Sequence, residues 1–128
     1  GAWEYVAAYV DNGHDYLTTN GQSIINADIK YKDVYIVGAS DSESSNYEAN
    51  KNKYGDAVYE TSSSHESSNS WYGDISYMPH TIWPWFLRGG FYYNGSAAGA
   101  FRFSSSSGDA NSIFSFRPVV APLAPSAP

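Results

Sequence analysis

Bulky and small residues alternate along the first ten positions of the chain. The segment from Ala2 to Val10 is rich in strand-forming residues, and a turn signal follows at Asp11 to Asp15. This pattern predicts a β-strand that ends at the turn. A shorter apolar run from Lys32 to Gly38 predicts a second, buried strand.

Two polar stretches separate this part of the chain from the rest. Residues 39–53 and 61–70 contain almost nothing to bury, so both are expected to be surface loops. Between them, the spacing of residues 54–61 predicts a short helix. One face of this helix would carry Tyr54, Ala57, Val58 and Thr61. Residues 71–86 are rich in aromatic rings and contain Pro79 and Pro84, which favours irregular structure lined with rings.

The last third of the chain returns to strand patterns. Strands are expected at 86–93, 99–104 and 114–120, with turns at "NGS" and "SSGDAN". Because side chains alternate along a strand, Phe101 and Phe103 should face the core and Arg102 should point away from it. Phe116 is expected in the same core.

Composition fits one aromatic-rich domain. Hydrophobic residues make up 42% of the 128 residues and aromatic residues 17%, including 12 Tyr and 4 Trp. A chain of this length can bury a sizeable core. We expect one domain at 1–120, with a Pro/Ala-rich tail or linker at 121–128. The first residue is not Met, which favours a part of a longer chain or assembly.

Charge and cysteine content exclude several classes of function. The formal net charge is -6, and the 7 Lys and Arg residues are spread thinly, so no basic stripe is available for nucleic acid. The chain contains no Cys, which removes disulfides and thiolate chemistry. No apolar run approaches the roughly 20 residues that a membrane-spanning helix needs, so direct membrane insertion is not expected.

Several short motifs occur in a characteristic order. These are "GAWEY" at the start, "FLRGG", then "AGAFRF", "GDAN" and a closing "SFRPVV". The order resembles the formylglycine-generating-enzyme-like branch of the C-type-lectin fold, over nearly the whole chain. The resemblance implies an α+β, C-type-lectin-like fold that is rich in strands, with one or two short helices and long surface loops.

The resemblance points to the non-enzymatic members of this branch. Its enzymes hold copper with a pair of cysteines, which this chain lacks, and fold alone does not transfer activity. The non-enzymatic members include phage receptor-binding tips and bacterial surface proteins diversified by retroelements. Randomised Asn codons in such proteins cannot encode Lys, Glu, Gln, Trp or Met. From Phe91 to Arg117 none of these five types occurs, although all occur earlier.

The chain also resembles bacterial surface or prepilin-type proteins of gut-type Firmicutes and their prophages. In that group the domain closes a longer chain, whereas this sequence starts just inside the first motif. The resemblance implies an extracellular, cell-surface or virion location.

The charged and glycine positions of the motifs favour a structural role. Glu4, Arg88 and Arg117 are expected to form a network of carboxylate and guanidinium groups near the strands. Gly89 and Gly90 are expected to permit close approach of backbones. No catalytic residue is predicted.

Histidines and acids give little support for a metal site. His14, His65 and His80 fall in separate contexts, and each is expected to be a solvated loop histidine. Five acids could meet a calcium ion, but their spacing matches no calcium-binding loop and a solvated acidic face is favoured: Asp41, Glu43, Glu48, Asp56 and Glu60. No cofactor is predicted.

The mixture of Tyr, Ser, Asn and Gly after Phe91 is the strongest functional signal. Rigid rings and adaptable hydrogen-bonding residues make up antibody paratopes. Ligand binding, against an ordinary surface, is therefore predicted for nine residues: Phe91, Tyr92, Tyr93, Arg102, Ser104, Ser105, Ser107, Asp109 and Ile113.

The sequence leaves three functions open. The favoured one is a non-enzymatic receptor-binding module on a phage tail or bacterial surface, with a protein or glycan partner on a cell surface. The alternatives are a structural subunit of a virion or pilus-like assembly and, third, a degenerate formylglycine-generating-type enzyme.

Overall fold

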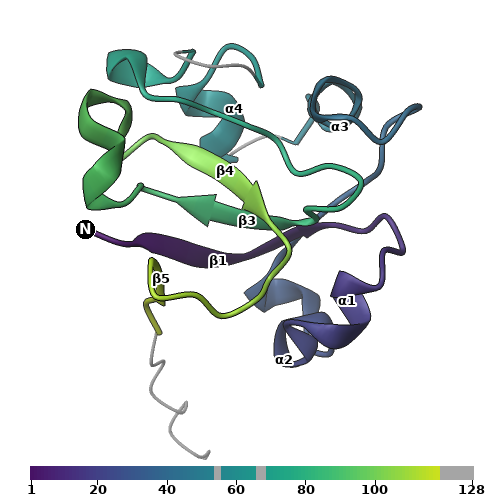
Figure 1. The fold of residues 1–128 in the computed structure, drawn as a ribbon. Helices are drawn as coiled ribbons and strands as arrows, with labels where there is room; N and C mark the ends of the chain where they lie inside the picture. The colour runs from purple at the N-terminus through teal and green to yellow at the C-terminus, as the bar shows by residue number, and fades with distance from the viewer. Residues whose placement is uncertain (54–55, 66–68, 119–128) are drawn as a thin grey trace, which may run out of the picture.

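A computed structural model of the chain describes residues 1–53, 56–65 and 69–118. It has an α+β architecture with one mixed sheet and several short helices (Figure 1). The strands are β1 (Trp3–Val10), β2 (Asp33–Tyr35), β3 (Trp85–Arg88), β4 (Phe103–Ser106) and β5 (Phe114–Phe116). The α-helices are α1 (Tyr16–Thr19), α2 (Gln22–Ile25), α3 (Glu43–Ala49) and α4 (Ala57–Thr61). Three 3-10 helices complete the list: η1 (Ile29–Tyr31), η2 (Trp71–Gly73) and η3 (Tyr92–Ala97).

Strand β1 organises the sheet. Strand β3 pairs with it antiparallel, and β4 extends the sheet antiparallel beyond β3. Strands β5 and β2 both pair with β1 in parallel, β5 with Trp3–Tyr5 and β2 with Ala8–Val10. Since β3 occupies one edge of β1, β5 and β2 must share the other. The three strands that carry the sequence motifs, β1, β3 and β5, are therefore neighbours.

The sheet buries a hydrophobic cluster on each face. Alternation along β1 sends Ala8 and Val10 to one cluster and Tyr9 to the other. The first cluster includes Tyr47 of α3 and packs against Val58 of α4, and the second includes Leu17 of α1. Helices α3 and α4 thus cover one face of the sheet, and α1 and α2 the other (Figure 1).

Two of the predicted elements are confirmed and a third is shortened. The first strand forms as β1. The helix expected within residues 54–61 forms as α4 in its described part, capped by Asp56 Oδ1, which accepts from the Val58 N–H at 2.9 Å, while Tyr54 lies outside the described residues. The buried strand expected at 32–38 is reduced to β2. Lys32 is the residue that closes η1 before it.

The prediction of a surface loop at 39–53 is wrong, because α3 forms there. Ser42 caps the helix by accepting from Ser45 N–H at 3.2 Å, while Ser45 Oγ accepts from Ser42 N–H at 3.0 Å. The helix buries Asn46 and Tyr47. Its inward face is partly polar, so the pattern of apolar residues did not predict this helix.

The loop expected at 61–70 is only partly exposed in its described part. Ser62 and Ser70 are buried and form an isolated β-bridge with one another. The ring-lined segment at 71–86 opens with the 3-10 helix η2, which was not predicted, and is irregular as predicted only from Asp74 to Pro84, where it buries Pro79 and Pro84.

The strand predicted at 86–93 stops early. Strand β3 ends at Arg88 because Gly89 and Gly90 adopt φ angles of 84° and 138°, which lie outside the strand region. The 3-10 helix η3 follows instead of a hairpin.

The strand predicted at 99–104 begins later, as β4. The Arg102 N–H donates to the Gly99 carbonyl at 3.2 Å, so residues 99–102 form a turn and side-chain alternation does not hold there. Phe103 is in the core as expected, whereas Phe101 is only partly buried. The strand predicted at 114–120 is shortened to β5, and positions 119–120 of the prediction lie outside the described residues. In β5, Phe116 is 78% exposed rather than in the core.

The structure also has more helices than the one or two expected. Helices α1 and α2 lie on either side of Asn20 and Gly21, and α-helices number four within the described residues. None of the helices in the described ranges is long and apolar enough to cross a membrane. The predicted tail, 121–128, lies outside the described residues.

Candidate functional site

Three neighbouring aromatic residues form an exposed surface immediately after β3. Phe91 stands next to Tyr92 and Tyr93 at the start of η3, and the three rings contact one another with centroids 5.4 to 6.4 Å apart. Tyr92 is 76% exposed and Tyr93 is 79% exposed. Backbone bonds fix their positions: Tyr92 N–H donates to the Gly1 carbonyl at 3.1 Å, and Phe91 N–H donates to Asn94 Oδ1 at 2.9 Å. The rings are therefore presented to solvent from an ordered segment.

A second group of rings lies around Phe101. The Tyr72 ring stacks on Phe101 at 5.8 Å, and the Trp71 ring meets it edge-on at 5.2 Å. Tyr72 has a positive φ of 63° and is 94% exposed. We call the two groups together the aromatic face: Trp71, Tyr72, Phe91, Tyr92, Tyr93 and Phe101. The sequence had indicated only that residues 71–86 would be lined with rings, since nothing in it pairs residue 72 with residue 101.

Asp74 joins the segments that carry the two groups. Its Oδ2 accepts from the Phe101 N–H at 3.0 Å, and its side chain packs against Gly99. Gly89 N–H in turn donates to the Arg102 carbonyl at 2.9 Å, and Gly90 lies against Ala98. These contacts lock the segment 97–102 between η2 and the end of β3. The close approach predicted for the two glycines is confirmed at Gly90 and is wrong at Gly89, where a Cβ would meet no atom within 4 Å.

We expect Gly99→Ala to disturb this frame. A Cβ at position 99 would lie 1.9 Å from Asp74 Oδ2, so the carboxylate would have to leave its hydrogen bond with Phe101. Overpacking of this kind costs about 1–3 kcal/mol of unfolding free energy. Urea unfolding would measure the loss, with Gly1→Ala as control, because a Cβ there would meet nothing closer than the Gly90 carbonyl oxygen at an ordinary 3.5 Å. Equal losses in the two variants would contradict tight packing at Gly99.

Arg102 does not point outward as the sequence predicted. It is buried, with 8% of its surface exposed, and its guanidinium lies 4.5 Å from the centre of the Trp3 ring. Its Nη1 donates to the Ala97 carbonyl at 2.7 Å. Burial lowers the pKa of Arg102. Arg102 therefore anchors the segment beneath the aromatic face.

Four of the other predicted binding residues lie along β3 or beyond its Trp85 end. Ser104 and Ser105 are half-buried in β4, opposite Leu87 and Phe86. Ser107 and Asp109 lie beyond the Trp85 end, away from the aromatic face, where Ser107 Oγ donates to Asp109 Oδ1 at 2.6 Å.

Ile113 lies close to the start of the chain. Its carbonyl accepts from the Trp3 N–H at 2.8 Å, and its side chain is half-buried. Of the nine predicted residues, the structure thus gathers only Phe91, Tyr92 and Tyr93 into one exposed surface.

A pocket of about 440 Å³ borders the aromatic face. Glu4 of β1, Arg88 of β3 and Arg117 after β5 line it, together with the small residues Ala2, Gly89, Gly90, Ala98, Gly99 and Ala100. Arg88 Nη2 and Arg117 Nε lie 3.5 Å and 3.4 Å from the Glu4 carboxylate. The predicted network of these three residues is confirmed, although both arginines are largely exposed.

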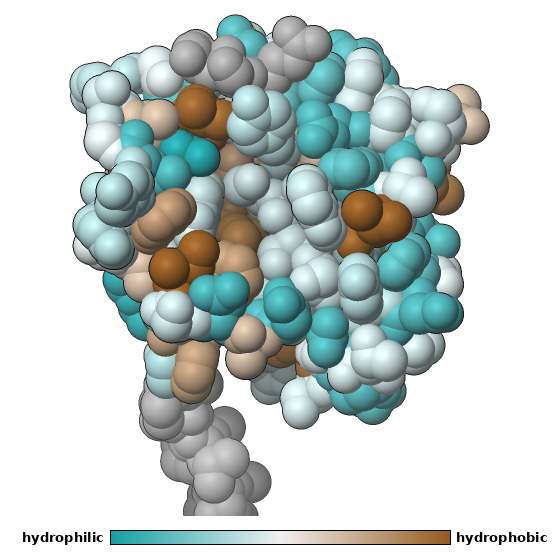
Figure 2. Space-filling model, viewed as in Figure 1, coloured by the Kyte–Doolittle hydropathy of each residue, from teal (hydrophilic) through white to brown (hydrophobic). Residues whose placement is uncertain are grey.

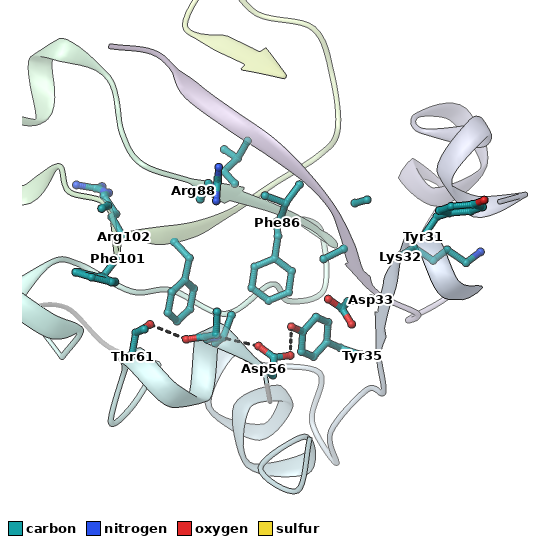
Figure 3. A pocket seen from close by; sticks show the side chains of 18 of the residues that line it. Tyr31, Lys32, Asp33, Tyr35, Asp56, Thr61, Phe86, Arg88, Phe101 and Arg102 are labelled. Carbon is teal, nitrogen blue, oxygen red and sulfur yellow. Dashed lines mark hydrogen bonds between the residues drawn. The ribbon is translucent and has the colours of Figure 1, made fainter. Parts of the chain in front are cut away.

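A larger groove of about 760 Å³ runs between α4 and the sheet (Figure 3). Phe86 lies in its floor, Phe101 and Arg102 at one end, and Tyr35 and Asp56 towards the other. The Tyr35 hydroxyl donates to Asp56 Oδ2. Burial raises the pKa of Tyr35, and the Asp56 carboxylate raises it further, so this pair is a neutral phenol bonded to a carboxylate. In the space-filling view, apolar side chains reach the surface in separate patches between polar ones (Figure 2).

Two of the three histidines are not simple solvated loop residues. His80 Nε2 lies 3.4 Å from Glu43 Oε1, and His65 Nδ1 lies 4.0 Å from Glu43 Oε2. His14 lies in a loop, where its Nδ1 accepts from the Tyr16 N–H at 3.1 Å. Within the ranges that the structure describes, no group of three or more His, Cys, Asp or Glu side chains is arranged to hold a metal ion.

The five acids considered for calcium do not converge in the structure, since four of them have separate partners. Asp41 accepts from Asn12 and Asn46, Glu48 pairs with Lys51 at 2.7 Å, Asp56 bonds Tyr35 and Glu43 faces the two histidines, while Glu60 lies exposed on α4. No protein-family model, curated protein or solved structure matches the chain.

Proposed function

We propose that this chain is a non-enzymatic binding module with a C-type-lectin-like fold, which recognises a protein or glycan receptor on a cell surface through its aromatic face. The fold assignment is supported by the adjacency of the three motif-bearing strands, β1, β3 and β5, in one sheet. The proposal places the module outside the cell, on a cell surface or a virion, and needs no cofactor.

The observation that carries the proposal is the exposure of Tyr92 and Tyr93. At 76% and 79% exposed, these rings contribute little to the core, although they occupy an ordered segment. Large rings with few rotatable bonds supply contact area at low entropic cost, and Tyr and Trp are the residues that dominate binding interfaces. An ordered group of exposed rings is the feature expected of a recognition surface.

The frame beneath the face supports the same proposal. Arg102, Asp74 and Gly99 hold the ring-bearing segments through buried contacts, while the rings themselves take little part in these contacts. The exposed rings of the face, Tyr72, Tyr92 and Tyr93, can therefore change without loss of the fold. This separation suits a domain whose binding residues vary on a constant scaffold.

The test is a comparison of surface variants. Parent protein is applied to arrayed glycans and to intact bacterial cells, and binding is compared with that of the double variant Tyr92→Ala/Tyr93→Ala. We expect the double variant to lose at least about 30-fold in affinity, because a single aromatic anchor at an interface is already worth about 2 kcal/mol or more. Its melting temperature should stay close to that of the parent.

Tyr16→Ala is the matched control. Tyr16 is 37% exposed on α1, at the opposite end of the sheet from η3 (Figure 1). This variant should bind like the parent. If the double variant also binds like the parent, the aromatic face is not the recognition surface, and a structural role in an assembly becomes the better interpretation.

A further inference from the structure

The exposed guanidinium groups of the chain lie beside the aromatic face. Arg88 ends β3, and Arg117 follows β5 on the neighbouring edge of β1; their side chains are 49% and 75% exposed. The remaining arginine, Arg102, is buried below them. The formal net charge of the whole chain is -6, so this end of the sheet is a local exception.

Glu4 cannot balance both arginines. In the described part of the chain it is the carboxylate with which each of them pairs, so two cations share one anion. The contacts of 3.5 Å and 3.4 Å are longer than the roughly 2.7–2.9 Å of tight charge-assisted hydrogen bonds. The nearby Asp74 is buried and accepts from Phe101, so it adds no acceptor at the surface. Because each guanidinium carries about five N–H donors, most of these donors are left for a ligand.

The walls of this pocket leave room for a ring. Gly89, Gly90, Ala98, Gly99 and Ala100 have almost no side chain, and the pocket of about 440 Å³ opens next to the segment that carries Tyr92 and Tyr93. Pockets of roughly 300–1,000 Å³ hold small organic ligands. The site thus combines exposed guanidinium groups with a space that has small walls, and its wall residues Gly90 and Ala100 are the chain neighbours of Phe91 and Phe101 in the aromatic face.

From this combination we infer that the Arg88–Arg117 pocket binds the carboxylate of an acidic sugar, a uronic or sialic acid, within a surface glycan. A guanidinium matches the two oxygens of a carboxylate, the pyranose ring fits the Gly/Ala walls, and the adjoining sugar lies against the tyrosine rings. The inference rests on the proposed function, since it names the ligand class of the same face. It favours a glycan over an acidic peptide because the pocket has the size of a compact ring.

Titration calorimetry with defined sugars tests the inference. The probes are 3′-sialyllactose and a glucuronic-acid disaccharide, with lactose and a glucose disaccharide as their neutral counterparts. We expect at least one acidic probe to bind at least about tenfold more tightly than its neutral counterpart, and Arg117→Gln to lose at least about tenfold of that affinity. Lys51→Gln removes the same charge from a lysine that pairs with Glu48, remote from the pocket, and should bind like the parent.

Glu4→Gln should change the affinity for the acidic probe in the opposite direction to Arg117→Gln. Removing the competing carboxylate should free both guanidiniums and strengthen binding of the acidic probe by about threefold or more, provided that circular dichroism shows the variant to be folded. If this variant does not fold, Arg88→Gln replaces it and should weaken binding as Arg117→Gln does. If Glu4, Arg88 and Arg117 had only a structural role, Glu4→Gln would not raise the affinity and acidic sugars would not be preferred.

The outcomes separate this inference from the proposed function. Equal binding of acidic and neutral sugars, no sugar binding at all, or equal losses in Arg117→Gln and Lys51→Gln would each overturn the acidic-sugar site. Arginine-dependent binding of an oligo-glutamate peptide without binding of acidic sugars would overturn it as well. A neutral glycan or protein receptor that depends on Tyr92 and Tyr93 would leave the proposed function standing.

Discussion

Replacement of Phe103 by alanine is expected to lower the free energy of unfolding by about 3–5 kcal/mol, whereas Phe116→Ala should change it by less than about 0.5 kcal/mol. Phe103 is 5% exposed and packs with Phe86 at a ring distance of 6.1 Å in the cluster beneath α3 and α4. Phe116 is 78% exposed at the end of β5. The first substitution leaves a cavity in the core, and the second removes a ring from solvent.

Urea unfolding monitored by tryptophan fluorescence would measure both values. Phe101→Ala extends the series, because Phe101 is partly buried under Trp71 and Tyr72 and should lie between the other two. Similar losses for Phe103→Ala and Phe116→Ala would mean that the two rings hold the frame equally, as the alternation of the sequence had suggested. That result would contradict the placement of β5 at the surface.

The same phenylalanines show what hydrophobic alternation can predict. Within β1 the pattern is reliable, because its eight residues share the strand conformation and those that join a cluster alternate: Val6, Ala8 and Val10 with the first cluster, Tyr5 and Tyr9 with the second. At Phe101 and Arg102 it fails, because these residues precede β4 and belong to a turn closed by Gly99. Alternation assigns faces only after the strand boundaries are known, and those depend on tertiary contacts.

The sequence contains a partial signal for the end of β3. Two adjacent glycines after Arg88 are unusual in a strand, and their positive φ angles end β3. The sequence suggested close backbone approach at these glycines but not that η3 would follow. The exposure of Tyr92 and Tyr93 results from this change of direction.

The sequence could not predict that Trp71, Tyr72 and Phe101, half of the aromatic face, lie together. Trp71 and Tyr72 meet Phe101 only because Asp74 bonds the Phe101 backbone across 27 positions. Such a contact has no local pattern. The Glu4, Arg88 and Arg117 network could be predicted, since each residue lies in a motif of a separate strand.

The second large effect is expected at Asn46, in the helix that hydrophobic patterning missed. Asn46 is completely buried, and its amide nitrogen donates to Asp41 Oδ1 at 2.9 Å and to the Pro79 carbonyl at 2.8 Å. Its Oδ1 accepts from the Gly38 N–H at 2.6 Å. One side chain therefore ties α3 to the segment after β2 and to the segment before β3.

Asn46→Ala should lower the free energy of unfolding by about 2–4 kcal/mol, because a buried polar group left without a partner costs about 1–3 kcal/mol and this change strands at least the Gly38 N–H and the Pro79 carbonyl. Asn46→Asp keeps the shape and the acceptor for Gly38 but loses both donors and places a carboxylate against Asp41. If the hydrogen bonds of Asn46 stabilise α3, Asn46→Asp should be at least as unstable as Asn46→Ala. If packing alone stabilises it, Asn46→Asp should be about as stable as the parent. Asn52→Ala, at an exposed asparagine in the turn after α3, is the control and should change stability by less than about 0.5 kcal/mol. Chemical unfolding of the three variants measures these values, and an Asn46→Ala variant as stable as Asn52→Ala would show that α3 is held by Tyr47 and its apolar contacts rather than by this polar tie.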